Sequence, residues 1–267
     1  MLAARGIARR HLIEVFDLLE TRLVGPDGSK PFHEMFDAAR GAVQREVTVA
    51  SDQPEAPLHG AYLAAALTGR RAEAWQLVVA ARGSGMSVAA LYQMLLVAQR
   101  RLGELWVSTT ISVAQEHMAS AVTQSVIARL YSEISGPRAR GSVLLAGVEG
   151  ELHGLPAQFA ADLLELDGWE VKFIGTNTPD RGILDAVARH SPAVLGISTT
   201  MTFNLPRMIA LAKAARAQFP TLPIVLGGRA IRGAGSLADE LGVEVDDAPR
   251  RHVLSPRAPQ PDLTGAV

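Results

Sequence analysis

Residues 142–156, SVLLAGVEGELHGLP, decide the fold of this chain. The first seven are an apolar run typical of a buried strand, and the glycines after it predict a loop before a helix. Further apolar runs follow, separated by segments of helical period. Strands that alternate with helices predict right-handed βαβ units and a Rossmann-like (flavodoxin-like), doubly wound parallel sheet. The expected strands are 142–148, 169–174, 193–198, 223–226 and 243–245, and the expected helices are 156–167, 180–190, 204–217 and 235–241.

The residues before this sheet have helical periodicity, so the expected fold class is α + α/β. N-terminal helices are expected at 6–24 and 32–49, and the two prolines within 51–57 predict a linker. Four helices with short loops follow, which predicts a four-helix bundle. They are expected at 58–68, 70–82, 87–105 and 110–134. The expected domains are an N-terminal helical segment at 1–53, the bundle at 54–136, the Rossmann-like domain at 137–250 and a tail at 251–267.

Composition excludes several classes of protein. The chain of 267 residues has 26 Lys+Arg against 27 Asp+Glu, and this near-neutral balance argues against a broad nucleic-acid-binding surface. It has no cysteine, which rules out a disulfide framework, a thiolate metal site, an iron–sulfur cluster and a thioether-linked chromophore. No apolar run is long enough for a membrane span, and the start does not resemble a signal peptide. We therefore expect a cytoplasmic protein with no direct contact to nucleic acid or membrane.

A histidine follows the first predicted strand, in the loop before a helix. Ligands of parallel α/β sheets bind outside the carboxyl ends of the strands, so His153 is well placed to ligate a metal. A ligating imidazole gives one nitrogen to the metal and the other to an orienting acceptor, and Glu151 is the candidate for that acceptor. The alternative is a surface-loop histidine beside a solvated glutamate.

Small residues lie at the ends of two other predicted strands, the third and the fourth. Ser198 and Thr200 come at the end of the third strand, and Gly227 and Gly228 at the end of the fourth. Such small side chains at adjacent strand ends predict a slot that a planar ring can enter. Taken singly, these residues are also ordinary turn formers.

Together these residues resemble the cobalamin-binding Rossmann-like domain, whose pattern is Asp-x-His-x-x-Gly, then Ser-x-Leu or Ser-x-Thr, then Gly-Gly. The resemblance implies that His153 is the lower axial ligand of cobalt, in place of dimethylbenzimidazole. It also implies that the displaced base enters the slot lined by Ser198, Thr200, Gly227 and Gly228. Two positions depart from the pattern. Glu151 stands in place of aspartate, which is similar to the light-sensing branch of the family, and Pro156 stands in place of glycine.

A second motif lies in the predicted bundle, where nine residues separate Trp106 from the pair Glu116-His117. The spacing resembles the W-x9-E-H signature of cobalamin-dependent photoreceptors of the CarH and LitR type. That resemblance implies that Trp106 covers the upper face of the corrin beside a 5′-deoxyadenosyl group, and that Glu116 and His117 help to define the upper pocket. The alternative is a buried tryptophan at a helix end with an exposed Glu-His pair.

One position departs from this photoreceptor type. There, a histidine directly after the tryptophan captures cobalt once light has broken the cobalt–carbon bond. This chain has Val107 at that position, so the same two-histidine product cannot form. His117, and then His59, are the nearest candidates for a replacement.

The resemblance implies a light sensor, not an enzyme, that holds adenosylcobalamin between a helical cap and the Rossmann-like domain. Photolysis then changes the arrangement of the domains or of an oligomer. The family's winged-helix DNA-reading module is not found in this sequence, so we expect the signal to pass to a second copy or to a signalling or transcription partner. The helices before residue 50 are the expected interface. A close variant is similar to standalone photocobilins, in which biliverdin is held without a covalent bond.

Two functions of other classes stay open. A corrinoid methyl carrier uses a similar cap and lower domain, and an antirepressor that binds haem or cobalamin through His153 would act on a transcription factor. Light-driven change of assembly separates the sensor from the carrier, and extraction of the cofactor identifies haem. The sequence does not decide the native upper ligand, the presence of a bilin, the oligomeric state, the downstream partner or the residue that replaces the missing histidine.

Overall fold

The computed structural model of the chain describes residues 57–231 and 244–246, with the single positions 17 and 37. Contacts between residues divide it into two compact units. The helical unit contains the described residues 57–86 and 93–126, and the sheet unit contains 87–92, 127–231 and 244–246.

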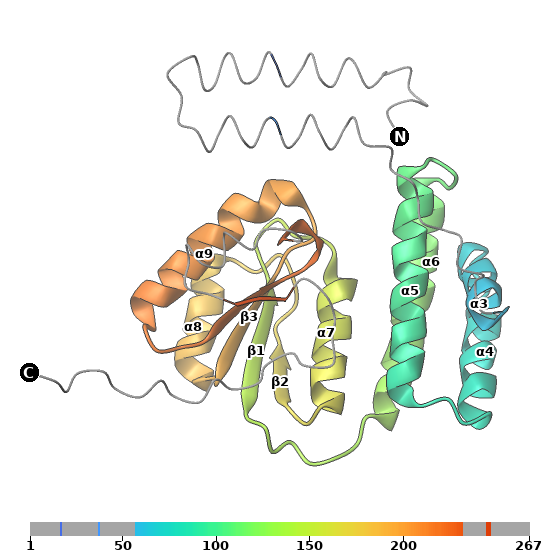
Figure 1. Cartoon of the computed structure of the whole chain (residues 1–267), viewed down its shortest axis with the longest axis horizontal. Coiled ribbons are helices and arrows are strands. Elements are labelled where there is room, and N and C mark those ends of the chain that lie inside the picture. The colour runs from blue at the N-terminus through green and yellow to red at the C-terminus, as the bar shows by residue number, and fades with distance from the viewer. Residues whose placement is uncertain (1–16, 18–36, 38–56, 232–243, 247–267) are drawn as a thin grey trace, which may run out of the picture. The chain divides into compact units, whose positions relative to one another are not determined.

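Four helices account for the first part of the chain: α3 (Pro57–Leu67), α4 (Arg71–Gly83), α5 (Val88–Val107) and α6 (Val113–Leu130), all labelled in Figure 1. They confirm the predicted helical half. The fourth helix is shorter than expected at both ends. It begins after a capping box, in which the Ser112 N–H donates to Gln115 Oε1 (2.9 Å) and the Gln115 N–H donates to Ser112 Oγ (3.2 Å). It ends before a single turn of 3-10 helix, Tyr131–Glu133.

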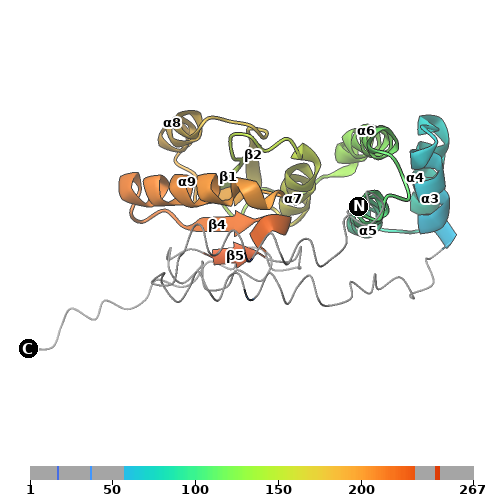
Figure 2. The ribbon, with the colours of Figure 1, turned by 90° about the horizontal axis from the view of Figure 1, so that it is seen from above.

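The sheet unit contains five parallel strands in the order β2-β1-β3-β4-β5, as the doubly wound prediction requires. The strands are β1 (Ser142–Gly147), β2 (Glu170–Phe173), β3 (Val194–Ser198), β4 (Ile224–Gly227) and β5 (Glu244–Asp246). The helices between them are α7 (Gly154–Leu166), α8 (Asp180–His190) and α9 (Leu205–Gln218), and Figure 2 shows them lying along the sheet. The predicted Rossmann-like fold is confirmed.

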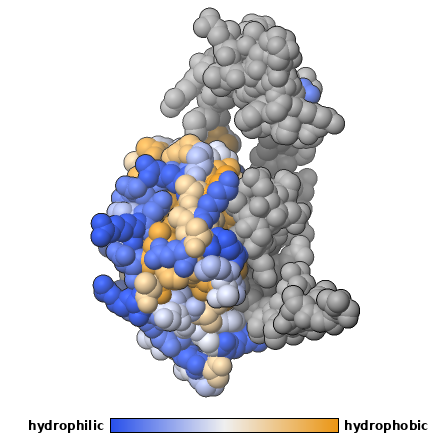
Figure 3. Space-filling view, turned by 90° about the vertical axis from the view of Figure 1, so that its left-hand side faces the viewer, coloured by the Kyte–Doolittle hydropathy of each residue, from blue (hydrophilic) through white to orange (hydrophobic). Residues whose placement is uncertain are grey.

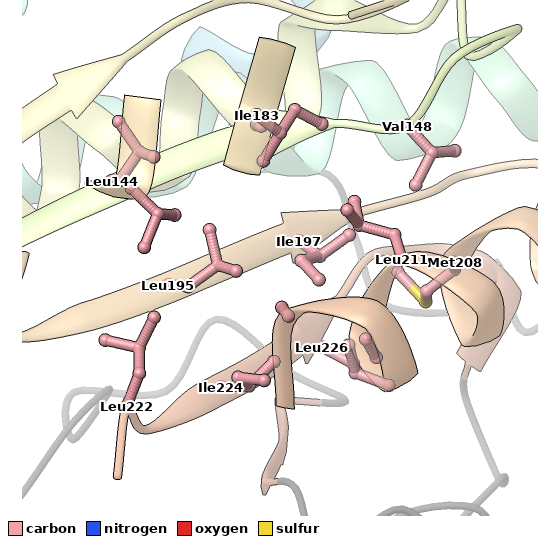
Figure 4. Packing of buried hydrophobic residues seen from close by; sticks show 14 of the residues in the cluster. Leu144, Val148, Ile183, Leu195, Ile197, Met208, Leu211, Leu222, Ile224 and Leu226 are labelled. Atoms are coloured by element: carbon pink, nitrogen blue, oxygen red, sulfur yellow. The ribbon is translucent and has the colours of Figure 1, made fainter. Parts of the chain in front are cut away.

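Alternation along the strands separates two apolar layers. Leu144, Leu195 and Leu226 point to the side covered by α8 and α9, where they pack with Ile183 and Met208 in the cluster of Figure 4. The residues between them on the strands point to the other side, where smaller clusters pack against α7. Burial on both sides explains why the strands read as continuous apolar runs.

Some predictions fall on residues that the structure does not describe. The helices expected at 6–24, 32–49 and 235–241 and the tail at 251–267 lie outside the described residues, apart from two single helical positions, 17 and 37.

Within the described part, no helix combines the length and the apolar character that crossing a bilayer requires. In the view of Figure 3, hydrophilic side chains alternate with hydrophobic patches over the coloured surface.

Candidate functional site

The loop after β1 carries the predicted ligand and its predicted acceptor. His153 directly precedes α7, and its side chain is half exposed. Glu151, two residues earlier, is only 1% exposed. A carboxylate this deeply buried is stable only if its oxygens are hydrogen-bonded. The partners of Glu151 therefore decide what this loop can do.

Glu151 accepts hydrogen bonds on both oxygens. Oε1 accepts from the His153 backbone N–H (2.9 Å) and from His153 Nδ1 (2.6 Å). Oε2 accepts from the loop after β3: the Thr199 hydroxyl (2.9 Å), the Thr200 N–H (2.7 Å), the Met201 N–H (3.2 Å) and the Asn204 side-chain amide (3.3 Å). Burial acts to raise the pKa of Glu151, but the hydrogen bonds from His153, Thr200 and Met201 outweigh it and hold the pKa far below its ordinary value.

The ionised carboxylate fixes the protonation of the imidazole. An ionised carboxylate can only accept, so the short contact at His153 Nδ1 requires the proton to be on Nδ1. In the neutral ring, Nε2 then has the lone pair, and it is the nitrogen that can ligate a metal. A histidine oriented in this way by a buried acid is the usual arrangement of a metal-ligating imidazole.

Neighbouring loops hold the backbone of this segment. The Gly150 N–H donates to Asn177 Oδ1 (2.8 Å) in the loop after β2, and Asn204 Nδ2 donates to the Gly150 carbonyl (3.4 Å). Gly150 has a φ of +84°, a conformation that favours glycine. The loops after β1, β2 and β3 are thus joined around His153. Sequence reasoning missed Asn177 and Asn204, whose only signal was an amide in a loop at the end of a neighbouring strand.

The strand register places the predicted slot residues in one row. Gly147 pairs with Ser198, and Ser198 pairs with Gly227, at the carboxyl ends of β1, β3 and β4. By alternation they face the side opposite the α8 and α9 cluster. A Cβ added to Gly227 would meet no atom of the described residues within 4 Å. The sheet edge is therefore open at Gly227, whereas at Gly147 the side chain of Thr176 already fills the space that a Cβ would take.

The two remaining slot residues are also constrained. Gly228 has a φ of +106°, and a Cβ there would lie 2.1 Å from the Thr199 carbonyl oxygen, so only glycine fits. The Thr200 hydroxyl oxygen is buried and makes no hydrogen bond within the described structure. A buried hydroxyl without a partner costs free energy unless a ligand or water satisfies it. Thr200 is therefore a candidate ligand contact.

These residues fit the lower side of cobalamin. Among the described residues, no group of three or more His, Cys, Asp or Glu side chains could hold a metal ion. A single protein nitrogen is what the cobalt of a corrin can take, because the corrin itself supplies the other ligands. His153 would supply that nitrogen, Glu151 would orient it, and Ser198, Thr200, Gly227 and Gly228 would line the place of the displaced base.

The upper-face candidates lie together at one end of the helical unit. Trp106 is in the last turn of α5, Glu116 is in the first turn of α6, and His117 directly follows Glu116. Glu116 Oε2 lies 3.6 Å from His117 Nε2, and the side chain of His117 is 74% exposed. Val107, where the photoreceptors have histidine, is exposed. His59, the more distant candidate, is buried, and its Nε2 has no partner within the described residues.

The structure thus gathers the nine predicted site residues into two sets. Glu151, His153, Ser198, Thr200, Gly227 and Gly228 lie at one edge of the sheet unit, and Trp106, Glu116 and His117 lie at one end of the helical unit. Their roles toward a ligand stay predictions.

Two known protein-family models match parts of this chain. A family model described as "B12 binding domain" matches residues 141–252, and a second model with the same description matches residues 58–131. Both models describe B12-binding domains, so the two matches support binding of cobalamin by this chain.

Two individual proteins show how far the similarity extends. The HTH-type transcriptional repressor CarH of Myxococcus xanthus is 30% identical over 145 residues, which are 54% of this chain and 48% of that protein. The chain therefore spans about half the length of this curated relative. The monomethylamine corrinoid protein of Methanosarcina barkeri has a structure with a TM-score of 0.61 and 16% identity, covering 69% of this chain and 89% of that one. At this identity the structural likeness shows the fold alone.

Proposed function

We propose that this chain is a cobalamin-dependent light sensor and not an enzyme. The lower face of the cofactor is held by the B12-binding domain of residues 141–252, through His153. The upper face is covered by the B12-binding domain of residues 58–131, through Trp106, Glu116 and His117. When bound, adenosylcobalamin supplies a cobalt–carbon bond that is weak enough for visible light to break.

The lower half of the proposal is supported by the protonation of His153. Glu151 keeps the proton on Nδ1, so Nε2 presents a lone pair from a half-exposed ring. A surface-loop histidine with a solvated glutamate, the alternative, does not describe this pair, because Glu151 is buried and accepts hydrogen bonds from two loops. The chain's own contribution at this face is thus a ligand that is oriented before the cofactor binds.

The observation that carries the light-sensing part is the position of the W-x9-E-H residues. The turn at 108–112 brings the end of α5 next to the start of α6, so Trp106, Glu116 and His117 share one end of the helical unit. A broad indole beside an acid and a histidine suits an upper ligand that has both an aromatic ring and polar groups. Adenosyl has both, and methyl has neither.

The output that we propose is a change in assembly or in a partner. A cofactor can shift an equilibrium between two arrangements only if it binds them with different free energies, and losing the adenosyl group removes the contacts that favour one of them. Because the relative from Myxococcus xanthus is a transcriptional repressor, we propose a second copy of the chain or a transcription-related protein as the receiver.

Purification in the dark tests this function. The chain is loaded with adenosylcobalamin, and absorption spectra and elution volumes are recorded before and after green light, with a parallel sample that also receives biliverdin and red light. We expect a light-dependent change in elution that hydroxocobalamin does not give. His153→Ala should abolish the change, whereas His190→Ala should keep it, because His190 ends α8 just before the start of β3, at the sheet edge opposite the loops that follow the strands. Bound cobalamin with unchanged assembly after complete photolysis would favour a methyl carrier, and bound haem an antirepressor.

A further inference from the structure

A chain of hydrogen-bonded polar side chains begins at Glu116 and connects α6, α5 and α3 within the helical unit. It runs from Glu116 and Ser120 of α6, one turn apart, to Gln99 of α5, and from there to Thr123 of α6 and Tyr62 of α3. Tyr62 and Thr123 are fully buried. Polar groups buried in this way are stable only as a connected network.

Thr123 fixes the direction of this chain. Its hydroxyl donates to the Ala119 carbonyl (3.2 Å) and accepts from the Tyr62 hydroxyl (3.0 Å) and from Gln99 Nε2 (2.7 Å). One donor and two acceptor positions are then all used. Because the Gln99 nitrogen faces Thr123, its carbonyl oxygen Oε1 faces Ser120. Burial raises the pKa of Tyr62 to about 12, so its hydroxyl keeps the proton that it donates.

The hydroxyl of Ser120 gives this chain of hydrogen-bonded side chains two possible states. Its oxygen lies 2.8 Å from Glu116 Oε1 and 3.1 Å from Gln99 Oε1. Both partners are acceptors when Glu116 is ionised, and a serine hydroxyl has a single proton. Ser120 can therefore serve Glu116 or Gln99, but not both at once. The charged acceptor holds the proton more strongly while it has no other donor.

We propose that Ser120 and Gln99 are positioning residues that connect the state of Glu116 to Tyr62 of α3. When a ligand donor engages Glu116, or when the carboxylate is removed, the Ser120 proton turns to Gln99 Oε1. This polarises the Gln99 amide, strengthens its bond to Thr123 and so changes the bond that Tyr62 makes to the same oxygen. That a ligand engages Glu116 rests on the proposed function, whereas the connection itself does not.

The test uses the full chain without cofactor. The chain has three tyrosines, so labelling their ring Cζ with 13C gives three NMR signals, and Tyr62→Phe assigns the one that belongs to Tyr62. Glu116→Ala removes the competing acceptor. We expect the Tyr62 signal to shift in Glu116→Ala relative to wild type, and we expect no shift between Ser120→Ala and the double variant Ser120→Ala, Glu116→Ala.

Two further variants separate positioning from mere packing. Ser120→Thr restores a hydroxyl and should restore the response to Glu116→Ala. Ser125→Ala is a matched control on the same helix, because the Ser125 hydroxyl donates to the Val122 carbonyl in its own helix (2.7 Å), and it should leave the response as in wild type. A Tyr62 shift on Glu116→Ala that is equally large without the Ser120 hydroxyl, or no shift at all, overturns the proposal.

A second arm separates this inference from the proposed function. Dark loading with adenosylcobalamin should move the Tyr62 signal of the wild-type chain toward its position in Glu116→Ala, and should leave Ser120→Ala unmoved. If the cofactor-free experiment succeeds and adenosylcobalamin binds without moving the signal, the connection stands and the proposed ligand contact of Glu116 fails. If the cofactor-free experiment fails, the connection is wrong whatever cobalamin does.

Discussion

Replacing Glu151 by glutamine tests whether this carboxylate orients His153 as a ligand of cobalt. The variant keeps the shape of the side chain, but it changes one accepting oxygen into an NH₂ group that donates. Four donors meet Oε2 and two meet Oε1. The new NH₂ group therefore meets the fewest opposing N–H and O–H donors when it faces His153.

In that orientation, the amide can donate to His153 Nδ1 only if the imidazole proton moves to Nε2. That tautomer has no lone pair at Nε2 and cannot ligate cobalt. The tautomer that can ligate places two N–H groups against each other. Loss of such an orienting partner lowers metal affinity about 10–100-fold. We therefore expect Glu151→Gln to bind cobalamin through His153 with an affinity about 10–100-fold lower than that of wild type.

The stability of the variant follows from the same contacts. The His153 backbone N–H loses its acceptor, at about 1–3 kcal/mol, and the bonds at the other oxygen fall from charged to neutral strength. A neutral amide is easier to bury than a carboxylate, which offsets part of this loss. We expect the free energy of unfolding of the cofactor-free chain to fall by about 2–4 kcal/mol.

Denaturant unfolding and dark titration with cobalamin, followed by absorbance, measure both effects. The matched control is Glu149→Gln in the same loop, whose carboxylate is half exposed and pairs with Arg207 at 2.5 Å. It should lose less than about 1 kcal/mol and bind cobalamin normally. If Glu151→Gln binds with wild-type affinity and the same histidine ligation, the reasoning about the tautomer is wrong.

Three further predictions concern other parts of the site. Gly228→Ala should destabilise the chain by about 3 kcal/mol or more in denaturant unfolding, since its left-handed φ and the Thr199 clash both oppose a Cβ. Gly227→Ala should change stability little and still weaken cobalamin binding, and equal stabilities of the two variants would contradict the argument from the added Cβ atoms. Because folding lowers the pKa of Glu151, the stabilisation by this carboxylate is present above its ordinary pKa near 4.5 and is lost as the pH falls. The difference in unfolding free energy between wild type and Glu151→Gln should therefore shrink below that pH. A difference that stays constant with pH would disprove this role of the carboxylate. Val107→His should give a photoproduct spectrum with two histidine ligands after illumination, and a spectrum identical to wild type would place Val107 away from cobalt.

The sequence predicted the parts of this structure that depend on local pattern. Buried apolar runs between turn residues located the strands, and their order in the chain indicated the parallel sheet. The Glu151 and His153 pair could be recognised because both residues lie in one short loop. A strand-end loop is also where parallel sheets bind ligands, which drew attention to it.

Contacts between distant residues could not be predicted in the same way. Asn177 and Asn204 meet the Glu151 loop only because β2 and β3 flank β1, and a loop asparagine has no periodicity that announces its partner. Gln99 and Ser120 read as ordinary polar helix residues. Their hydrogen bond joins two helices, and sequence spacing alone does not fix which faces meet.

The central claim is that His153 ligates the cobalt of a bound cobalamin, and electron paramagnetic resonance tests it most directly. The chain contains seven histidines, and it is prepared with all of them labelled with 15N and loaded with unlabelled cobalamin in the cobalt(II) state. A 15N ligand splits the cobalt lines into doublets, whereas the 14N of the cofactor's own base splits them into triplets. The account predicts doublets that disappear in His153→Ala. Triplets in the labelled wild-type chain, or doublets that persist in His153→Ala, would contradict it.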